Sequence, residues 1–186
     1  VDATRTETLA IAEAYAAAGV TESVALRGDA PKGAQRFVPH PLGFANSVEL
    51  VDKLARTGKF KIRVGAYPEP HPDAADATSD VTWLKRKIDA GASSAMTQFF
   101  FDADTFFRFR DACVKAGITA PIIPGILPIT SWEGAKKFAR RCGTSVPHKL
   151  DEAFTTAARD GREELLALAQ CTALCDRLIT GGVQDL

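Results

Sequence analysis

The chain has 186 residues, of which 46% are apolar and 25% are charged, a composition typical of one folded globular domain. Its 23 basic and 23 acidic residues give a net charge of zero, which argues against a nucleic-acid or membrane surface bound through bulk charge. No apolar run approaches the ~20 residues that a membrane-spanning helix needs, so we expect neither nucleic acid nor a membrane as a partner.

Helical and strand patterns alternate along the chain. Helices are indicated by apolar residues three and four apart, and strands by short apolar or β-branched runs. In chain order the patterns predict a helix over 3–19, a strand over 22–27, a helix from Asn46 or Ser47 to about Thr57, a strand over 60–67, a helix over 80–90, a strand over 95–101, a helix over 105–116, a strand over 121–127, and helices over 132–142, 148–159 and 162–180. Gly19 and Gly91 suit helix ends, whereas Asp102 or Asp104 and Ser131 suit helix starts.

This order predicts a parallel sheet, because a helix separates each strand from the next. Two architectures fit: a doubly wound open sheet and a (β/α)8 barrel. No G-x-G-x-x-G motif follows a strand, and special polar residues gather just after strand ends, where barrel active sites lie. Four strands cannot close a barrel, which usually takes ~250 residues. We therefore predict an α/β fold, a single domain over residues 1–186 that is part of a TIM barrel. The start at Val1 without Met also makes us expect a longer complete protein.

The four cysteines indicate free thiols rather than a metal site. Cys171 and Cys175 share one helix face, but neither C-x-x-C nor H-x-x-x-H occurs in the chain. We interpret them, and Cys113, as buried thiols. This composition fits a reducing compartment, so we expect a cytoplasmic protein.

Two segments after predicted strands are candidates for ligand binding. Arg27, Gly28 and Asp29 follow the first strand and could form an ion pair that closes a turn or lie at a central pocket. An adhesion function for this Arg-Gly-Asp tripeptide is disfavoured because it follows a strand predicted to be buried. Tyr67 and His71 lie in a loop stiffened by three prolines, which could be a structural turn or a ligand clamp.

Two further features carry polar groups near strand ends. Asp80, Lys85, Arg86 and Lys87 form a charge run that could be a solvated helix face or a phosphate site. Gln98 lies inside an apolar strand, where an unpartnered amide would cost a few kcal/mol. Its amide suits bidentate contact with a heterocycle, so we favour a ligand-binding function. Residues 99–101, all Phe, are expected in the core, and no catalytic triad or metal cluster emerges.

Five segments carry a resemblance to a known family. They are ALRGD at 25–29, AYPEPHP at 66–72, LKRKIDAGA at 84–92, TQFFFD at 97–102 and PIIPGILPI at 121–129. In this order and spacing the chain resembles bacterial methylenetetrahydrofolate reductase over essentially its whole length. The family is a (β/α)8 barrel that holds FAD noncovalently and reduces 5,10-methylenetetrahydrofolate to 5-methyltetrahydrofolate with NADH or NADPH. The resemblance also implies a cytoplasmic homo-oligomer acting in one-carbon and methionine metabolism.

The resemblance implies roles for individual residues. Asp29 and Gln98 would be catalytic, Asp29 because its negative charge near flavin and pterin would stabilise a cationic form of the substrate. Asp29, Gln98 and Phe138 would contact the substrate. The residues that would contact FAD are Arg27, Gly28, Asp29, Phe44, Ala45, Tyr67, His71, Ala74, Asp80, Arg86 and Lys87.

The chain also departs from the family pattern. We expect the family's general acid, a Glu of the first strand, to lie upstream of this chain, together with a His and a Thr of the next strands. The last strand, with a substrate-binding Arg, would follow residue 186. Trp83 and Gly134 stand where relatives can carry polar contacts. We therefore expect that this chain alone cannot complete catalysis. A non-catalytic flavin- or folate-binding barrel, and a barrel lyase acting on a phosphorylated substrate, are the alternatives.

Overall fold

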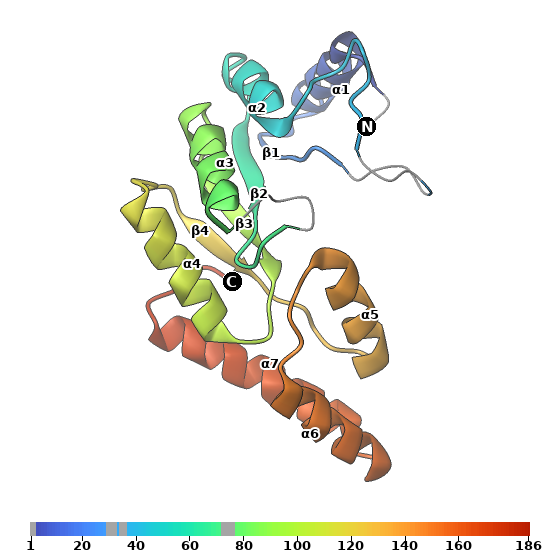
Figure 1. Cartoon of the computed structure of the whole chain (residues 1–186). Helices are drawn as coiled ribbons and strands as arrows, with labels where there is room; N and C mark the ends of the chain where they lie inside the picture. Colours follow the sequence, from blue (N-terminus) through green and yellow to red (C-terminus); the bar gives the residue numbers. More distant parts are fainter. Residues whose placement is uncertain (1–2, 29–32, 34–36, 72–76) are drawn as a thin grey trace. The chain divides into compact units, whose positions relative to one another are not determined.

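The computed structural model describes residues 3–28, 33, 37–71 and 77–186 (Figure 1). Within these ranges the elements follow in the order α1 (Arg5–Ala17), β1 (Glu22–Ala25), α2 (Ser47–Ala55), β2 (Lys61–Ala66), α3 (Ala77–Asp89), β3 (Ser94–Phe99), α4 (Ala103–Lys115), β4 (Ile122–Gly125), α5 (Trp132–Cys142), α6 (His148–Arg159) and α7 (Glu163–Thr180). None of these described helices is both long enough and apolar enough to cross a membrane.

The strands form one sheet whose spatial order follows the chain, β1-β2-β3-β4. Strands β1 and β2 are parallel, with Glu22 opposite Lys61 and Ala25 opposite Val64. A helix connects each strand to the next, as parallel neighbours require. The predicted α/β class with a parallel sheet is therefore confirmed.

The chain divides into two compact units. The first comprises residues 1–65 and 82–95, and the second comprises residues 66–81 and 96–186. The division falls inside β2, α3 and β3, so each of these elements contributes residues to both units. A single domain over residues 1–186 stays a prediction.

The core of the first unit forms between α2 and the sheet. Val51 and Leu54 project from one face of α2 and are buried, as are Ile62 and Val64 of β2. The alternating burial of β2 is what a strand shows when one of its faces is covered. Asn46 begins α2 by accepting hydrogen bonds from the Val48 and Glu49 N–H groups, which confirms the predicted cap.

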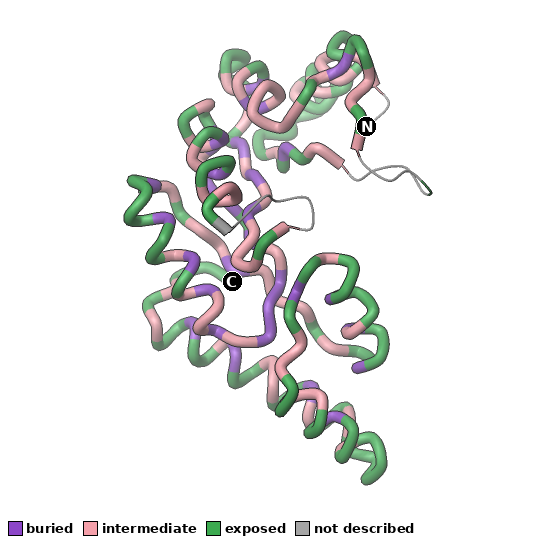
Figure 2. The backbone as a smooth tube through the Cα atoms, in the orientation of Figure 1, coloured by how far each residue is buried: buried purple, intermediate pink, exposed green. Residues whose placement is uncertain are grey.

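The core of the second unit is aromatic. Phe99 and Phe101 pack in one cluster with Trp132 and Phe154, whereas Phe100 packs in another with α4 and α7. This split follows from the alternation of side chains along an extended segment. Trp132 stacks on Phe154 with ring centroids 4.2 Å apart and 9° between their planes. The predicted core positions 99–101 are confirmed, and Figure 2 shows the buried tube running through this segment.

Three sequence predictions were wrong. In the described part of the chain strand β1 is only partly buried, since Ala25 is buried but Val24 is 50% exposed, because β1 is the first strand in the order of this sheet. Helix α3 starts at Ala77 rather than at residue 80, because Thr78 and Ser79 join the helix instead of the preceding loop. Cys171 and Cys175 are half-buried on α7 rather than buried, although Cys113 is fully buried as predicted.

Candidate functional site

The end of β2 brings three predicted site residues of the second unit together. The rings of Tyr67 and His71 pack edge to face, with their centroids 4.5 Å apart and their planes at 81°. The His71 backbone N–H donates to Asp80 Oδ2 at 2.9 Å, and Asp80 lies in the first turn of α3. The loop after β2 is thus tied to the following helix, an arrangement that suits the predicted clamp.

The same loop carries a contact that sequence analysis missed. Both carboxylate oxygens of Glu69 accept from the Ser145 N–H, at 3.0 and 3.1 Å, across 76 positions of sequence. Ser145 follows α5, the helix that carries Phe138. This bond therefore joins the loop after β2 to the segment after α5. No sequence signal could have found it, because the donor is a backbone N–H that every residue except Pro possesses.

Gln98 lies one residue before the end of β3 and is half-buried. Its Oε1 accepts from the Phe99 N–H at 3.1 Å, and its amide NH2 makes no hydrogen bond to another described residue. Two N–H donors at a strand end therefore remain for a ligand.

Phe138 lies against Phe99, with ring centroids 5.1 Å apart and 19° between the planes, and it is still 41% exposed. Phe138 therefore offers an exposed aromatic surface on α5.

In the first unit, the segment after β1 holds Arg27 and Gly28. The Arg27 guanidinium lies over the ring of Phe37, 4.6 Å from its centroid, and Arg27 Nε donates to Gly28 O at 3.3 Å. Gly28 has φ +82°, a left-handed conformation that L side chains rarely adopt. The turn predicted to contact a cofactor therefore depends on glycine at this position.

Phe44 and Ala45, also in the first unit, lie in a loop tied to both neighbouring helices. Arg5 of α1 lies over the Phe44 ring, 5.2 Å from its centroid, and forms an ion pair with Glu49 of α2. Glu49 Oε2 also accepts from the Ala45 N–H at 3.3 Å. These contacts hold the loop that contains Phe44 and Ala45 in one conformation between α1 and α2.

The charge run on α3 divides into two environments. Lys87 is only 8% exposed, and its Nζ donates to the carbonyl of Gly65 near the end of β2. Arg86 is exposed and lies over the Trp83 ring, 5.0 Å from its centroid. Lys87 is therefore not part of a solvated face, whereas Arg86 is available at the surface.

The predicted residues thus fall in two groups. Arg27, Gly28, Phe44, Ala45, Arg86 and Lys87 belong to the first unit, and Tyr67, His71, Asp80, Gln98 and Phe138 belong to the second. Asp29 and Ala74 lie outside the described residues. Among the described residues no cluster of three or more His, Cys, Asp or Glu side chains could hold a metal ion.

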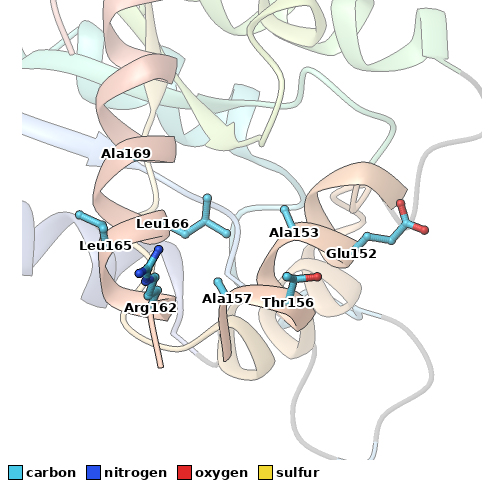
Figure 3. Close-up of a pocket in the computed structure, with 8 residues that line it drawn as sticks. All are labelled: Glu152, Ala153, Thr156, Ala157, Arg162, Leu165, Leu166 and Ala169. Atoms are coloured by element: carbon cyan, nitrogen blue, oxygen red, sulfur yellow. The ribbon is translucent and has the colours of Figure 1, made fainter. Parts of the chain in front are cut away.

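A groove between α6 and α7 has a volume of about 530 Å³ (Figure 3). It is lined largely by short and apolar side chains, including Ala153, Ala157 and Leu166, with Glu152 and Arg162 at its margins. None of the predicted site residues lines it, so it is separate from the candidate site.

The charges at the start of α5 form a small network. Lys136 Nζ lies 2.9 Å from Asp151 Oδ1 and 2.7 Å from Glu133 Oε1. Hydrogen bonds from Lys136 and from the Trp132 indole lower the pKa of Asp151, while the bonds to Glu133 and Asp151 raise the pKa of Lys136. Both shifts keep the groups ionised, which orients α5 against α6.

The sequence model of the family described as "Methylenetetrahydrofolate reductase" matches residues 1–186. The chain belongs to the methylenetetrahydrofolate reductase family. It is 45% identical over 186 residues to the 5,10-methylenetetrahydrofolate reductase of Salmonella typhimurium and 46% identical over 186 residues to that of Escherichia coli, covering 100% of this chain in each case. The chain spans 61% of the length of each of these relatives.

A plant protein and a solved structure are also similar to this chain. "Methylenetetrahydrofolate reductase (NADH) 1" of Arabidopsis thaliana is 36% identical over 181 residues, covering 90% of this chain and 30% of the plant protein. A solved structure titled "Uncharacterized protein from Clostridium thermocellum binds two copies of 5-methyl-5,6,7,8-tetrahydrofolic acid" matches with a TM-score of 0.50 and 15% identity. That match covers 83% of this chain and 56% of the other, and it supports the fold alone.

Proposed function

We propose that the protein containing this chain reduces 5,10-methylenetetrahydrofolate to 5-methyltetrahydrofolate, using FAD and either NADH or NADPH. The observation that carries the proposal is the family match over residues 1–186, with 45% and 46% identity to two bacterial reductases. On this proposal residues 1–186 are one domain, part of a (β/α)8 barrel that lacks the first strands and the last strand. The protein would act as a cytoplasmic homo-oligomer.

Each unit, taken by itself, offers groups that suit a flavin dinucleotide. In the second unit the rings of Tyr67 and His71 suit a flat ligand, and in the first unit the guanidinium groups of Arg27 and Arg86 suit an anionic one. Lys87, whose Nζ donates to the carbonyl of Gly65, is proposed on the resemblance alone. The left-handed backbone at Gly28 permits close approach of a ligand to the main chain. When bound, FAD would supply the hydride-transfer chemistry.

The remaining FAD contacts are proposed on the resemblance. Phe44 and Ala45 would lie along the cofactor, in the loop that Arg5 and Glu49 hold. Asp80 would act through His71, whose N–H it already binds. Asp29 and Ala74 complete the proposed set from outside the described residues.

The folate would be held by Gln98, Phe138 and Asp29. The free NH2 donors of Gln98 suit the acceptor edge of a pterin, while its oxygen could exchange the Phe99 N–H for a ligand donor. Phe138 offers an exposed ring. The carboxylate of Asp29 would favour positive charge on the substrate as the reaction proceeds.

Purification of the full-length protein tests the proposal directly. We expect a yellow protein with a flavin spectrum that NADH or NADPH bleaches and that methylenetetrahydrofolate restores. Flavin that bleaches but is not restored, or that binds without bleaching, would favour a non-catalytic flavin-binding barrel. A colourless folded protein that does not take up FAD would exclude both and favour the lyase alternative.

The roles of Asp29 and Gln98 can be separated in the two half-reactions. Asp29→Asn should slow restoration by folate more than bleaching by NADH, and equal slowing would contradict the role. Gln98→Glu should weaken folate binding, because it replaces two N–H donors with an acceptor. An unchanged folate affinity would contradict that assignment.

A further inference from the structure

The groove between α6 and α7 presents an apolar surface to solvent. Ala153, Ala157 and Ala169 line it together with Leu165, which is 64% exposed. In Figure 3 the side chains of Ala153 on α6 and Leu166 on α7 point toward one another across the groove. Covering such a surface is favourable because it removes apolar atoms from water, and a surface of this kind marks a binding partner.

The groove suits another helix better than a small ligand. Ligand pockets carry several converging polar groups that orient the molecule. Among the described residues that line this groove, only Thr156 has a neutral polar side chain, and the two charged ones lie at its margins. A groove between two helices that is lined by short side chains can instead receive the ridge of side chains of a further helix.

The two charged residues of the groove lie at its opposite ends. Arg162 is the N-cap of α7, beside the short connection that makes α6 and α7 a helical hairpin. Glu152 lies about 12 Å along α6 from Asp160, the residue that ends this helix. Within the described part of the chain the Arg162 side chain forms no ion pair or hydrogen bond, and Glu152 pairs with the exposed His148 of its own helix. Both charges are therefore available to a partner.

We propose that this groove binds the same groove of a second copy of the chain, with the two α7 helices antiparallel around a two-fold axis. The inference rests on the proposed function, in which the protein is a homo-oligomer, and it assigns a surface to that assembly. A two-fold contact brings the same patch of both copies together, so one end of the patch meets the other end. Arg162 of each copy would therefore lie level with the partner's Glu152, and two symmetric ion pairs would close the contact.

The apolar side chains complement one another under the same symmetry. Leu165 and Ala169 are four residues apart on one face of α7, which corresponds to about 6 Å along the helix axis. When two copies of α7 pack antiparallel about a point midway between these residues, each Leu165 lies on the partner's Ala169. A large exposed side chain then meets a small one at both places, as close packing requires. One axis thus satisfies both the charged ends and the apolar centre.

The charged pairs should contribute modestly to association because they are exposed. An exposed ion pair contributes about 1.4-fold to 5-fold to affinity, so two symmetric pairs predict about 2-fold to 30-fold. Reversing one charge replaces both attractions with repulsions and should weaken association by at least this factor. The effect should decline as salt is raised, because screening weakens exposed charge pairs.

The test measures self-association of the FAD-loaded full-length protein by sedimentation equilibrium at several concentrations. We expect Arg162→Glu and Glu152→Arg each to weaken association, and the double variant to restore it, because the pair forms again with its charges exchanged. Leu165→Ala should weaken association as well, and the charge exchange should not rescue it. Glu164→Arg is the matched control, since Glu164 is exposed on α7, about 160° around the helix from Arg162, and does not line the groove. Melting temperatures should show that each variant is folded.

Three results would overturn the inference. They are an unaltered protein that stays monomeric, equal association of Arg162→Glu and the control, and a double variant that associates no better than the single ones. A groove that is protected from hydrogen exchange in a monomeric protein would assign it to another segment of the same protein, against the inference. Bleaching of the flavin by NADH and its restoration by methylenetetrahydrofolate, followed in the same samples, test the proposed function separately. Association without this chemistry would overturn the proposed function alone, and the chemistry without association would overturn the inference alone.

Discussion

Replacing Glu69 tests whether the bond to Ser145 holds the loop after β2 in place. A hydrogen bond to a charged group contributes about 1.5–3 kcal/mol when it is well shielded from water. Glu69 is half-buried and the Ser145 N–H is at the surface, so we expect a contribution below this range, and Glu69→Ala should lower the free energy of unfolding by about 1 kcal/mol. Glu69→Gln keeps one oxygen acceptor and should lower the free energy of unfolding by about half as much as Glu69→Ala does.

The assay is urea unfolding of the FAD-free full-length protein, paired with titration of FAD into each variant. Loosening the loop that carries Tyr67 and His71 should weaken FAD binding by up to about tenfold, with Glu69→Gln between Glu69→Ala and the unaltered protein. Glu152→Gln on α6 is the control, since Glu152 is exposed and its ion pair is with the exposed His148. If Glu69→Ala binds FAD as tightly as the control does, the bond to Ser145 does not hold the loop for FAD binding, even where the free energy of unfolding has changed.

Three further predictions concern packing and ionisation. Trp132→Phe removes the indole donor to Asp151 and should lower the free energy of unfolding by about 2 kcal/mol, measured by urea unfolding. A loss of unfolding free energy smaller than that caused by a substitution at an exposed position would contradict the role of this bond. Gly125→Ala should cost about 3 kcal/mol or reduce the yield of folded protein, because a Cβ there would overlap the carbonyl oxygen of Thr97; a normal melting temperature would show that β3 and β4 can separate. Burial raises the pKa of the Cys113 thiol from 9.0 to about 11, so at pH 8 it should react with a thiol reagent far more slowly than Cys171. The pKa of Cys113 is higher in the folded than in the unfolded protein, so its contribution to stability is present below pH 9 and is lost as the pH rises through about 11. Equal rates of labelling of Cys113 and Cys171 would refute the burial argument.

The order of the helices and strands could be predicted from the sequence because local signals decide it. Ser131 caps α5 by accepting from the Gly134 N–H, as its position before an amphipathic stretch indicated. Apolar runs marked β2, β3 and β4, and Phe100 is buried as expected. Burial of β1 was predicted wrongly because a run of apolar residues does not reveal whether a strand has one neighbour or two.

The candidate site could be predicted only in part. Strand ends identified the Tyr67 and Gln98 segments, because loops that follow parallel strands meet at one edge of a sheet. The charge run on α3 was ambiguous, since spacing alone cannot show that Lys87 is buried against Gly65 while Arg86 is exposed. Individual roles came from the family resemblance rather than from local pattern, and they stay predictions.

Three carboxylates of the second unit explain why its loops could not be placed from the sequence. Glu69 binds the Ser145 N–H, Glu163 binds the Trp132 N–H, and Asp80 binds the His71 N–H, across 76, 31 and 9 positions respectively.

In each case the acceptor is a conspicuous acidic residue, whereas the donor is a backbone group without any signature in the sequence. A sequence pattern can therefore show that a carboxylate is present but not which loop it holds. Because these bonds fix the segments that bear His71 and Phe138, the geometry of the candidate site depends on contacts that only the folded chain reveals.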